Sequence, residues 1–348
     1  MVCIAAFIIL IIVGIFVAFI SIFKPKIGKR YLKILKKSWG CVGKRMTLQK
    51  CETGFGDEVK NSILSRVLIK QPKLVKPLSV AIEVLSILLV VITIWSLVEG
   101  AKAGLALYSL GTCNVQRPEA CALGAEVCSI DAGSGPTNPV EYIQYWFEDW
   151  GEIFGAIPDK FRSWNVEEFD FTGVFIGKGD YKAIDIFDPG CVVCLQSFKN
   201  QLNAGFFDDG KTLLVPFPIQ DTAGQFKFRN SKLIAGYILG ADKVNRDSNA
   251  AFKIVQRIYV GKDPEHRSYQ DLFNDYLSAE DAEALLKEWL AEFELSDEDI
   301  AKVAEFAHSD EYEEIIAHNN DIVVNNIHAK GIPTMIYDGK KHTGRWEE

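Results

Sequence analysis

The chain has 348 residues, enough for about two domains, and its 48% apolar residues, including 22 Phe and 7 Trp, allow a real hydrophobic core. Its net charge of −8 hides a division, because residues 24–77 hold 15 Lys and Arg against three acidic residues. The average charge is therefore a poor guide to partners, and this division needs a physical cause.

Two apolar runs flank the basic segment. Residues 1–23 contain no charged residue, and residues 78–98 contain only Glu83. Each is about the 20 residues that a helix needs to cross a bilayer. The alternatives are a cleaved signal peptide for the first run, which lacks a basic start and a small-residue cleavage site, and a buried core helix for the second. We predict two transmembrane helices, the second continuing past Glu99.

The basic segment sets the predicted orientation. Short loops rich in Lys and Arg stay on the cytoplasmic side, so residues 24–77 are expected inside and the chain after about residue 99 outside. This two-pass arrangement in the cell membrane accounts for the basic segment more simply than a nucleic-acid-binding patch. We therefore expect the lipid bilayer, and no nucleic acid, as a partner.

An extracytoplasmic linker is predicted over residues 99–168. Its first part is rich in Cys, Gly, Pro and Asn. Within residues 141–163 the spacing predicts a helix with one aromatic face. Such a face suits either the outer membrane interface or packing on the domain that follows, and the pattern leaves both open. The face consists of Ile143, Trp146, Phe147, Trp150 and Phe154.

A compact α/β domain is predicted over residues 169–348. Strands are expected at 169–176, 182–187, 211–219 and 334–337, and a helix begins at Cys191 after an Asp-Pro-Gly turn. A long stretch of strong helix formers predicts a helical insert at about 229–318, between the third and the last of these strands.

The sequence Cys191-Val-Val-Cys194 lies at this strand-to-helix junction. A helix N-terminus stabilises a thiolate, and a second thiol one turn later can resolve a mixed disulfide. A CxxC can equally be half of a zinc site, which needs two more ligands. The five His and the other Cys form no second ligand motif, so no metal is expected.

Two further features favour redox chemistry. Asp185 lies six residues before Cys191 in an otherwise apolar strand, where a buried carboxylate is costly unless it has a task such as proton relay. Far downstream, Pro333 precedes a strand, where proline is awkward, and indicates a cis Ile332–Pro333 bond. Such a bond would present the backbone of Ile332 to an extended cysteine peptide.

Together, IDIFDPGCVVC and GIPTMIYDGK resemble the thioredoxin superfamily, and the helical insert resembles its DsbA family. The resemblance implies an α/β, thioredoxin-like fold with a large helical insertion, here preceded by two transmembrane helices. It implies an attacking Cys191, a resolving Cys194, a buried acid at Asp185 and a cis-Pro at Pro333. It places Ile332, Val192, Val193 and Thr334 at the substrate.

This sequence departs from the family pattern in two places. The dipeptide Val192-Val193 is neither the Pro-His of DsbA nor the Gly-Pro of thioredoxin, so the direction of electron transfer stays open. A closing C-terminal helix is missing or very short.

The remaining cysteines divide by predicted compartment. Cys113 and Cys121 are expected to form a structural disulfide outside the membrane, leaving Cys128 free or bonded between chains. A further hypothesis is that one disulfide pair among these cysteines exchanges electrons with Cys191 and Cys194 as a built-in relay. Cys41 and Cys51 are expected in the reducing cytoplasmic loop as free thiols.

These patterns predict a membrane-anchored, extracytoplasmic thiol–disulfide oxidoreductase that acts on protein cysteines and needs no cofactor. A membrane or soluble redox partner would regenerate the CVVC pair. The alternative is a module on the same scaffold that binds a metal or a partner through its thiols.

Overall fold

The computed structural model describes residues 72–347, apart from 122–126, 131–135, 209 and 221–223, together with a few residues between 29 and 64. The chain divides into two compact units, Met1–Ala101 and Lys102–Glu348. The predicted first span, residues 1–23, and the thiols of Cys41 and Cys51 lie outside the described residues.

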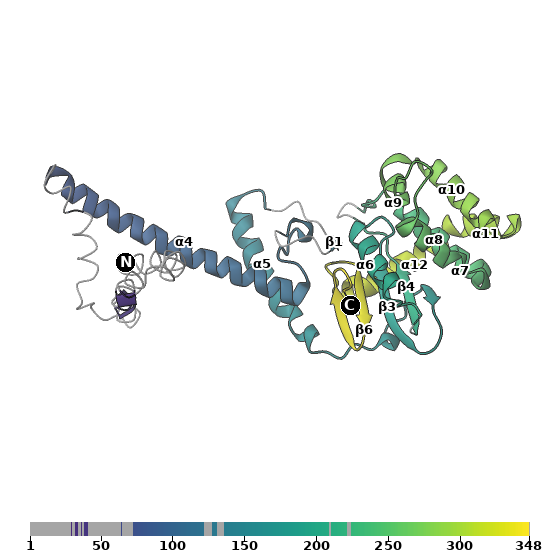
Figure 1. Cartoon of the computed structure of the whole chain (residues 1–348), viewed down its shortest axis with the longest axis horizontal. Coiled ribbons are helices and arrows are strands. Elements are labelled where there is room, and N and C mark those ends of the chain that lie inside the picture. The colour runs from purple at the N-terminus through teal and green to yellow at the C-terminus, as the bar shows by residue number, and fades with distance from the viewer. Residues whose placement is uncertain are drawn as a thin grey trace. The chain divides into compact units, whose positions relative to one another are not determined.

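Helix α4, Val75–Leu110, is 36 residues long (Figure 1). Among the described residues, it is the one helix long and apolar enough to cross a membrane. At 1.5 Å per residue it measures about 54 Å, against a hydrocarbon core of about 30 Å. As expected, it continues past Glu99, and it ends where Gly111 takes the left-handed φ of +76° that glycine adopts readily.

Helix α5, Pro139–Ala156, corresponds to the predicted aromatic helix. It begins at Asn138, whose side chain accepts the backbone N–H groups of Val140 and Glu141. Its buried Ile153 packs with Ala106, Leu110 and Val115, at and beyond the end of α4. Its aromatic face is largely uncovered, because Ile143, Phe147 and Phe154 are exposed.

The sheet of the α/β domain has the strand order β2-β4-β3-β6-β7. The neighbours β3 (Tyr181–Phe187) and β4 (Lys211–Pro216) run parallel and are joined through helix α6 (Val192–Asn203). Strands β2 (Val174–Ile176), β6 (Thr334–Tyr337) and β7 (Lys340–Thr343) each run antiparallel to their neighbours. The central strand β3 is buried over its last five residues, which matches its unbroken apolar sequence.

The four predicted strands are present. Strand β3 begins one residue earlier than predicted, and β4 ends at Pro216 rather than at residue 219. Two further differences concern β2 and β7. Strand β2 covers only the end of 169–176, because the aromatic residues before it pack as a cluster in which Trp164 stacks on Phe169. Strand β7 was not predicted, and it pairs with β6 through a turn at Asp338 and Gly339, both with positive φ.

The helical insert follows β4 and contains six α-helices, one of them a single turn that continues as a π-helix. Its largest fully buried side chains include Trp289, Tyr237, Tyr312 and Phe273. Helix α7 packs closely on α11, and a Cβ on Gly236 would lie 2.9 Å from that of Ala307. The helices are α7 (Ser231–Asn245), α8 (Ala250–Val260), α9 (Tyr269–Asp271), α10 (Ala279–Glu292), α11 (Asp297–Ala307) and α12 (Asp310–Asp321).

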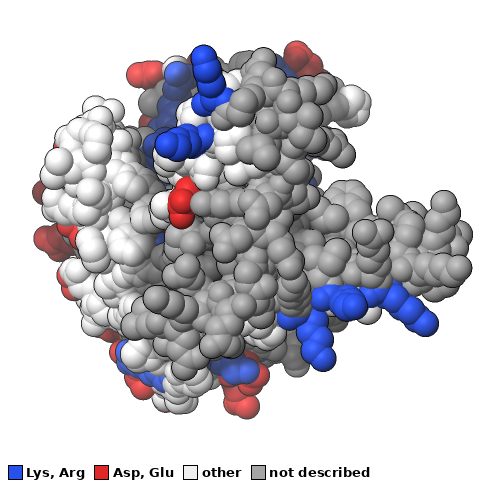
Figure 2. All heavy atoms as spheres, turned by 90° about the vertical axis from the view of Figure 1, so that its left-hand side faces the viewer, with Lys and Arg blue, Asp and Glu red and all other residues white. Residues whose placement is uncertain are grey.

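Two short strands add a second sheet beside the first. Strand β1, Cys128–Ser129, pairs antiparallel with β5, Gly331–Ile332. Figure 1 shows β1 on the side of the domain nearest α5. Figure 2 shows Lys and Arg as well as Asp and Glu side chains of the described residues at the surface.

Candidate active site

The turn between β3 and α6 is built by Asp188. Its carboxylate accepts the backbone N–H groups of Gly190 at 2.7 Å and Ile219 at 2.6 Å. Its carbonyl oxygen accepts the N–H of Cys191 at 3.0 Å. The Asp-Pro-Gly sequence therefore folds into a closed turn that delivers Cys191 to the first position of the helix.

Cys191 caps the N-terminus of α6, where its sulfur accepts the N–H of Cys194 at 3.4 Å. The same sulfur lies 3.7 Å from the carbonyl oxygen of Ile332. The Ile332–Pro333 bond is cis, as the sequence indicated. Four of the residues singled out from the sequence thus meet at one place, although they are separated by about 140 positions in the chain.

The disulfide pattern differs from expectation at Cys128. Cys113 and Cys121 are bonded as predicted, whereas Cys128 is neither free nor bonded between chains but forms a disulfide with Cys191. Its position follows from β1, in which Cys128 lies opposite Ile332 and Ser129 opposite Gly331. The thiol of Cys194 is free and buried.

The segment 127–130 is fitted to the backbone before Pro333. The N–H of Ile130 donates to the carbonyl of Lys330 at 3.2 Å, beyond the paired residues of β1 and β5. A Cβ on Gly331 would lie 2.6 Å from that of Val127, so the fit depends on the absence of a side chain there. Cys191 has no exposed surface, and the segment bonded to it is part of what covers it.

Two buried carboxylates flank Cys194. Burial raises the pKa of Asp185 to about 6 and that of Asp188 to about 7, although hydrogen bonds oppose both shifts. Burial also raises the pKa of the Cys194 thiol, and negative charge on Asp188 and Asp185 raises it further. The thiol is therefore protonated at neutral pH in this state, beside two groups that can take up a proton there.

Asp185 lies in the middle of β3, opposite Met335 of β6 and Leu214 of β4. Its Oδ2 accepts a hydrogen bond from Nε2 of Gln201 at 2.9 Å. Its Oδ1 and the Gln201 carbonyl oxygen are buried without a hydrogen-bond partner among the described residues. An unpaired buried carboxylate oxygen has the open acceptor position that a transferred proton requires.

The helical insert holds the same turn from its other side. Nε2 of Gln270 donates to the carbonyls of Pro189 at 2.8 Å and Cys191 at 3.0 Å. Nδ2 of Asn274 donates to the carbonyl of Gly190 at 2.9 Å, and the hydroxyl of Tyr259 donates to that of Asp188 at 2.8 Å. The carbonyls of four consecutive residues thus receive donors from the insert. Sequence reasoning missed these three residues and Asp188, because nothing local in a helical pattern marks such contacts.

The three other predicted substrate contacts differ in exposure. Val192 is 55% exposed, whereas Val193 and Thr334 are buried. The Thr334 hydroxyl donates to the carbonyl of Gly331 at 2.7 Å, which links β6 to β5 across Pro333. Of the three, only Val192 presents its side chain at the surface in this state.

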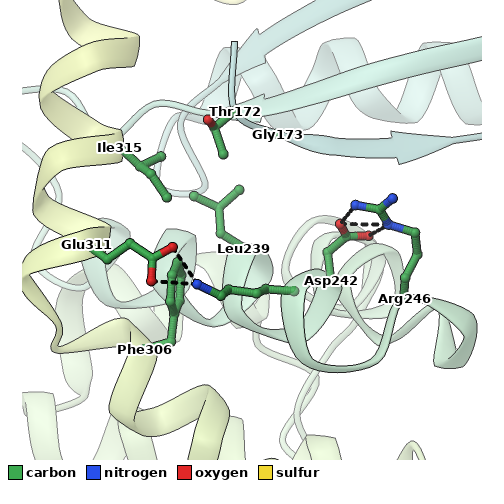
Figure 3. Close-up of a pocket in the computed structure, with 9 residues that line it drawn as sticks. Thr172, Gly173, Leu239, Asp242, Arg246, Phe306, Glu311 and Ile315 are labelled. Atoms are coloured by element: carbon green, nitrogen blue, oxygen red, sulfur yellow. Dashed lines mark hydrogen bonds and ion pairs between the residues drawn. The ribbon is translucent and has the colours of Figure 1, made fainter.

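A cleft of about 440 Å³ lies elsewhere, lined by α7, α12 and the loop before β2 (Figure 3). The two cationic side chains that line it form ion pairs, Lys243 with Glu311 and Arg246 with Asp242, the latter at 2.7 Å. None of the predicted site residues lines it. Among the described residues there is also no cluster of three or more His, Cys, Asp or Glu that could hold a metal ion.

Comparisons with known proteins give matches among solved structures alone. No protein-family model matches the chain, and no curated protein matches it. Solved structures that match it include the catalytic domain of Proteus mirabilis ScsC, with 13% identity, a TM-score of 0.34, and coverage of 51% of this chain and 84% of that one.

Two further matches are the thiol–disulfide exchange protein α-DsbA2 of Wolbachia pipientis and MdbA, a thiol–disulfide oxidoreductase of Corynebacterium matruchotii. Their identities are 16% and 14% and their TM-scores 0.36 and 0.37. Each match covers 51% of this chain. The matches cover 83% of the α-DsbA2 chain and 85% of the MdbA chain. The sheet order, the cysteine at the start of α6, the cis-Pro and the helical insert are the features that the sequence predicted for a thioredoxin-like fold with a large helical insertion.

Proposed function

We propose that this chain is a membrane-anchored, extracytoplasmic thiol–disulfide oxidoreductase that acts on protein cysteines through Cys191 and Cys194. The observation that carries the proposal is the position of the Cys191 sulfur. It lies at a helix N-terminus and 3.7 Å from the carbonyl before the cis-Pro, and it is bonded to a cysteine in a paired strand.

The geometry supports exchange in two steps. The Cys191 thiolate attacks one sulfur of a substrate disulfide, and the other substrate sulfur leaves as a thiolate. The Cys194 thiolate then attacks the Cys191 sulfur, the substrate thiolate leaves, and a Cys191–Cys194 disulfide remains. The reverse sequence oxidises a substrate dithiol. The proposed function requires no chemistry beyond this thiol–disulfide exchange. A membrane or soluble redox partner would return Cys191 and Cys194 to the redox state in which they began.

The buried carboxylates supply the proton step. Cys194 has a raised pKa and must lose its proton before it attacks. At neutral pH, Asp185, with a pKa of about 6, is largely ionised, and Asp188, with a pKa of about 7, is partly ionised. Either carboxylate can accept the proton. We infer that Asp185, whose Oδ1 has no partner in the described residues, takes the proton.

The membrane part of the proposal rests on α4 and on the charge division of the sequence. The side chains along α4 that would face lipid are exposed and apolar, among them Leu85, Leu88 and Ile92. The basic residues before α4 favour the cytoplasmic side for its N-terminal end. The catalytic domain then lies outside the cell, which suits a disulfide between Cys113 and Cys121.

The test compares three variants of the full chain in insulin reduction and in oxidative refolding of a reduced protein. Cys191→Ser should lower both rates to the level without enzyme. Cys194→Ala should hold Cys191 in mixed disulfides, with Cys128 or with a substrate cysteine, because the resolving thiol is gone. The double variant Cys113→Ser/Cys121→Ser, which removes the other disulfide and keeps Cys191 and Cys194, should retain the parent rate. A Cys191→Ser variant as active as the parent would refute the proposal.

The alternative function is a module that binds a metal or a partner through these thiols. A metal content near one per chain after purification, without exchange activity, would favour it. No described group of donors supports this alternative at present.

A further inference from the structure

We propose that Cys128 is a third redox-active cysteine, and that residues 127–130 act as an internal substrate that occupies the substrate-peptide site of its own domain. This inference rests on the proposed function. It adds the chemical class of the substrate, an extended peptide that pairs with Gly331–Ile332, and a way in which the chain regulates access to Cys191.

The first argument is the backbone pairing. Strand β1 runs antiparallel to the two residues before the cis-Pro, with Cys128 opposite Ile332. The Ile130 N–H continues the pairing with Lys330. A cysteine held in an extended segment beside the reactive sulfur has the geometry that an incoming protein cysteine needs, since main-chain hydrogen bonds of an added strand give affinity for any sequence.

The second argument is the side chains around the segment. Val127 fills the space over Gly331, where a Cβ would collide with it. The carbonyl and hydroxyl oxygens of Ser129 lie 3.4 and 3.5 Å from Nζ of Lys227. The site that pairs with residues 127–130 therefore accepts a branched apolar residue before the cysteine and a small polar residue after it. These contacts predict the side chains that external substrates carry at the same positions.

The third argument is the state of the sulfurs. Three cysteines lie together at this site. Cys128 and Cys191 form a disulfide, and Cys194 is a free thiol. Attack of the Cys194 thiolate on the Cys191 sulfur breaks the first bond and forms Cys191–Cys194. Cys128 leaves as a thiolate and takes up the proton that Cys194 released. The exchange is an isomerisation and needs no external oxidant or reductant.

The consequence is competition between the tether and external substrates. Cys128 lies 63 residues from Cys191 in the same chain, and a tethered thiol acts at an effective concentration of up to about millimolar, above that of a micromolar protein substrate. The segment 127–130 therefore keeps Cys191 covered until an external cysteine displaces it. A resting enzyme of this kind would react slowly with cysteines that do not pair with Gly331–Ile332.

The test maps the disulfides of the full chain in detergent, equilibrated in glutathione buffers and quenched in acid before alkylation and peptide mass analysis. The parent should contain both Cys128–Cys191 and Cys191–Cys194. Cys194→Ala should contain only the first bond, and Cys128→Ser only the second. Gly331→Ala should shift the parent toward Cys191–Cys194, because its Cβ displaces Val127.

The kinetic arm uses insulin at micromolar concentration. Cys128→Ser should raise the initial exchange rate about tenfold or more, because the tethered competitor is gone. The Cys113→Ser/Cys121→Ser control, which removes a disulfide of the same linker but keeps Cys128, should not show this rise.

Three results would overturn the inference. The first is that Cys128 is never found bonded to Cys191. The second is that the Cys128–Cys191 bond gives no Cys191–Cys194 bond at any glutathione ratio. The third is that the exchange rate of Cys128→Ser equals that of the parent. If Cys191→Ser is inactive in the same assay, such a result removes this inference alone. If Cys191→Ser is as active as the parent, the proposed function fails as well.

Discussion

At the scale of single residues, the two buried carboxylates differ in what the sequence could reveal. Asp185 was predicted to be buried because it interrupts an apolar strand, and it is 4% exposed in the central strand of the sheet. Asp188 belongs to an Asp-Pro-Gly sequence, which indicates a turn and therefore solvent. It is fully buried only because the insert closes over that turn, and the insert lies far away in the sequence.

The bond from Gln201 to Asp185 sets the pH range of the proposed proton transfer. It stabilises the charged carboxylate and so lowers a pKa that burial has raised to about 6. Gln201→Leu removes this bond, so the pKa of Asp185 should rise further. The carboxylate that accepts the Cys194 proton is then present only at higher pH. The acid limb of the exchange rate against pH should move upward by roughly one unit.

The measurement is the initial rate of insulin reduction from about pH 5 to pH 8, with Gln144→Leu on the exposed side of α5 as the matched control. A structural role of Gln201 alone would lower the rate at every pH without moving the midpoint. An unchanged midpoint would therefore argue against Asp185 as the proton acceptor.

At the scale of elements, the strands and helices with a clear hydrophobic pattern in the sequence were predictable. Strands that form only through pairing with distant residues were not. Strand β6 has the predicted bounds, and β3 differs by one residue. Strand β1 has two residues and no period, and it exists only because Gly331 and Ile332 lie beside it, some 200 residues later. The bond from Cys128 to Cys191 could not be predicted for the same reason.

The contact between the insert and the active-site turn gives a second prediction. Gln270 is buried and donates to the carbonyls of Pro189 and Cys191. The Cys191 carbonyl also accepts the N–H of Leu195 at 3.1 Å, whereas the Pro189 carbonyl has no other donor among the described residues. Gln270→Leu would therefore leave the Pro189 carbonyl unsatisfied, and we expect the free energy of unfolding to fall by roughly 1–3 kcal/mol.

Denaturant unfolding monitored by Trp fluorescence measures this loss. Gln144→Leu, at an exposed position of α5, should change the free energy of unfolding by less than about 0.5 kcal/mol. Equal effects of the two variants would show that the insert does not hold the turn through Gln270.

At the scale of the whole molecule, the proposed architecture joins a membrane anchor to a domain in which the sulfur of Cys191 is bonded to a cysteine of the preceding linker. The proposed anchor could be suggested from the sequence because apolar runs and charge blocks are local signals. The covering of Cys191 could not, since it depends on residues 63 positions apart in sequence. The linker that looked like a spacer is, in the structure, part of the active site.

The proposed topology gives the last prediction. Leu88 and Ile92 lie one helical turn apart in α4 and are 51% and 63% exposed. An arginine at the centre of a span costs about 2.5–3.5 kcal/mol, so Leu88→Arg/Ile92→Arg should prevent the second crossing. The catalytic domain should then remain on the cytoplasmic side with the basic segment. There, reducing conditions should leave Cys113 and Cys121 as thiols.

Protease protection in intact cells or spheroplasts, combined with alkylation of Cys113 and Cys121, reads out this change. The control Val260→Arg/Val324→Arg places two arginines at exposed positions of the catalytic domain, and it should leave the domain outside with its disulfide formed. If the α4 variant behaved like this control, α4 would not be a membrane span. The proposed topology would then fail, while the proposed chemistry at Cys191 would be unaffected.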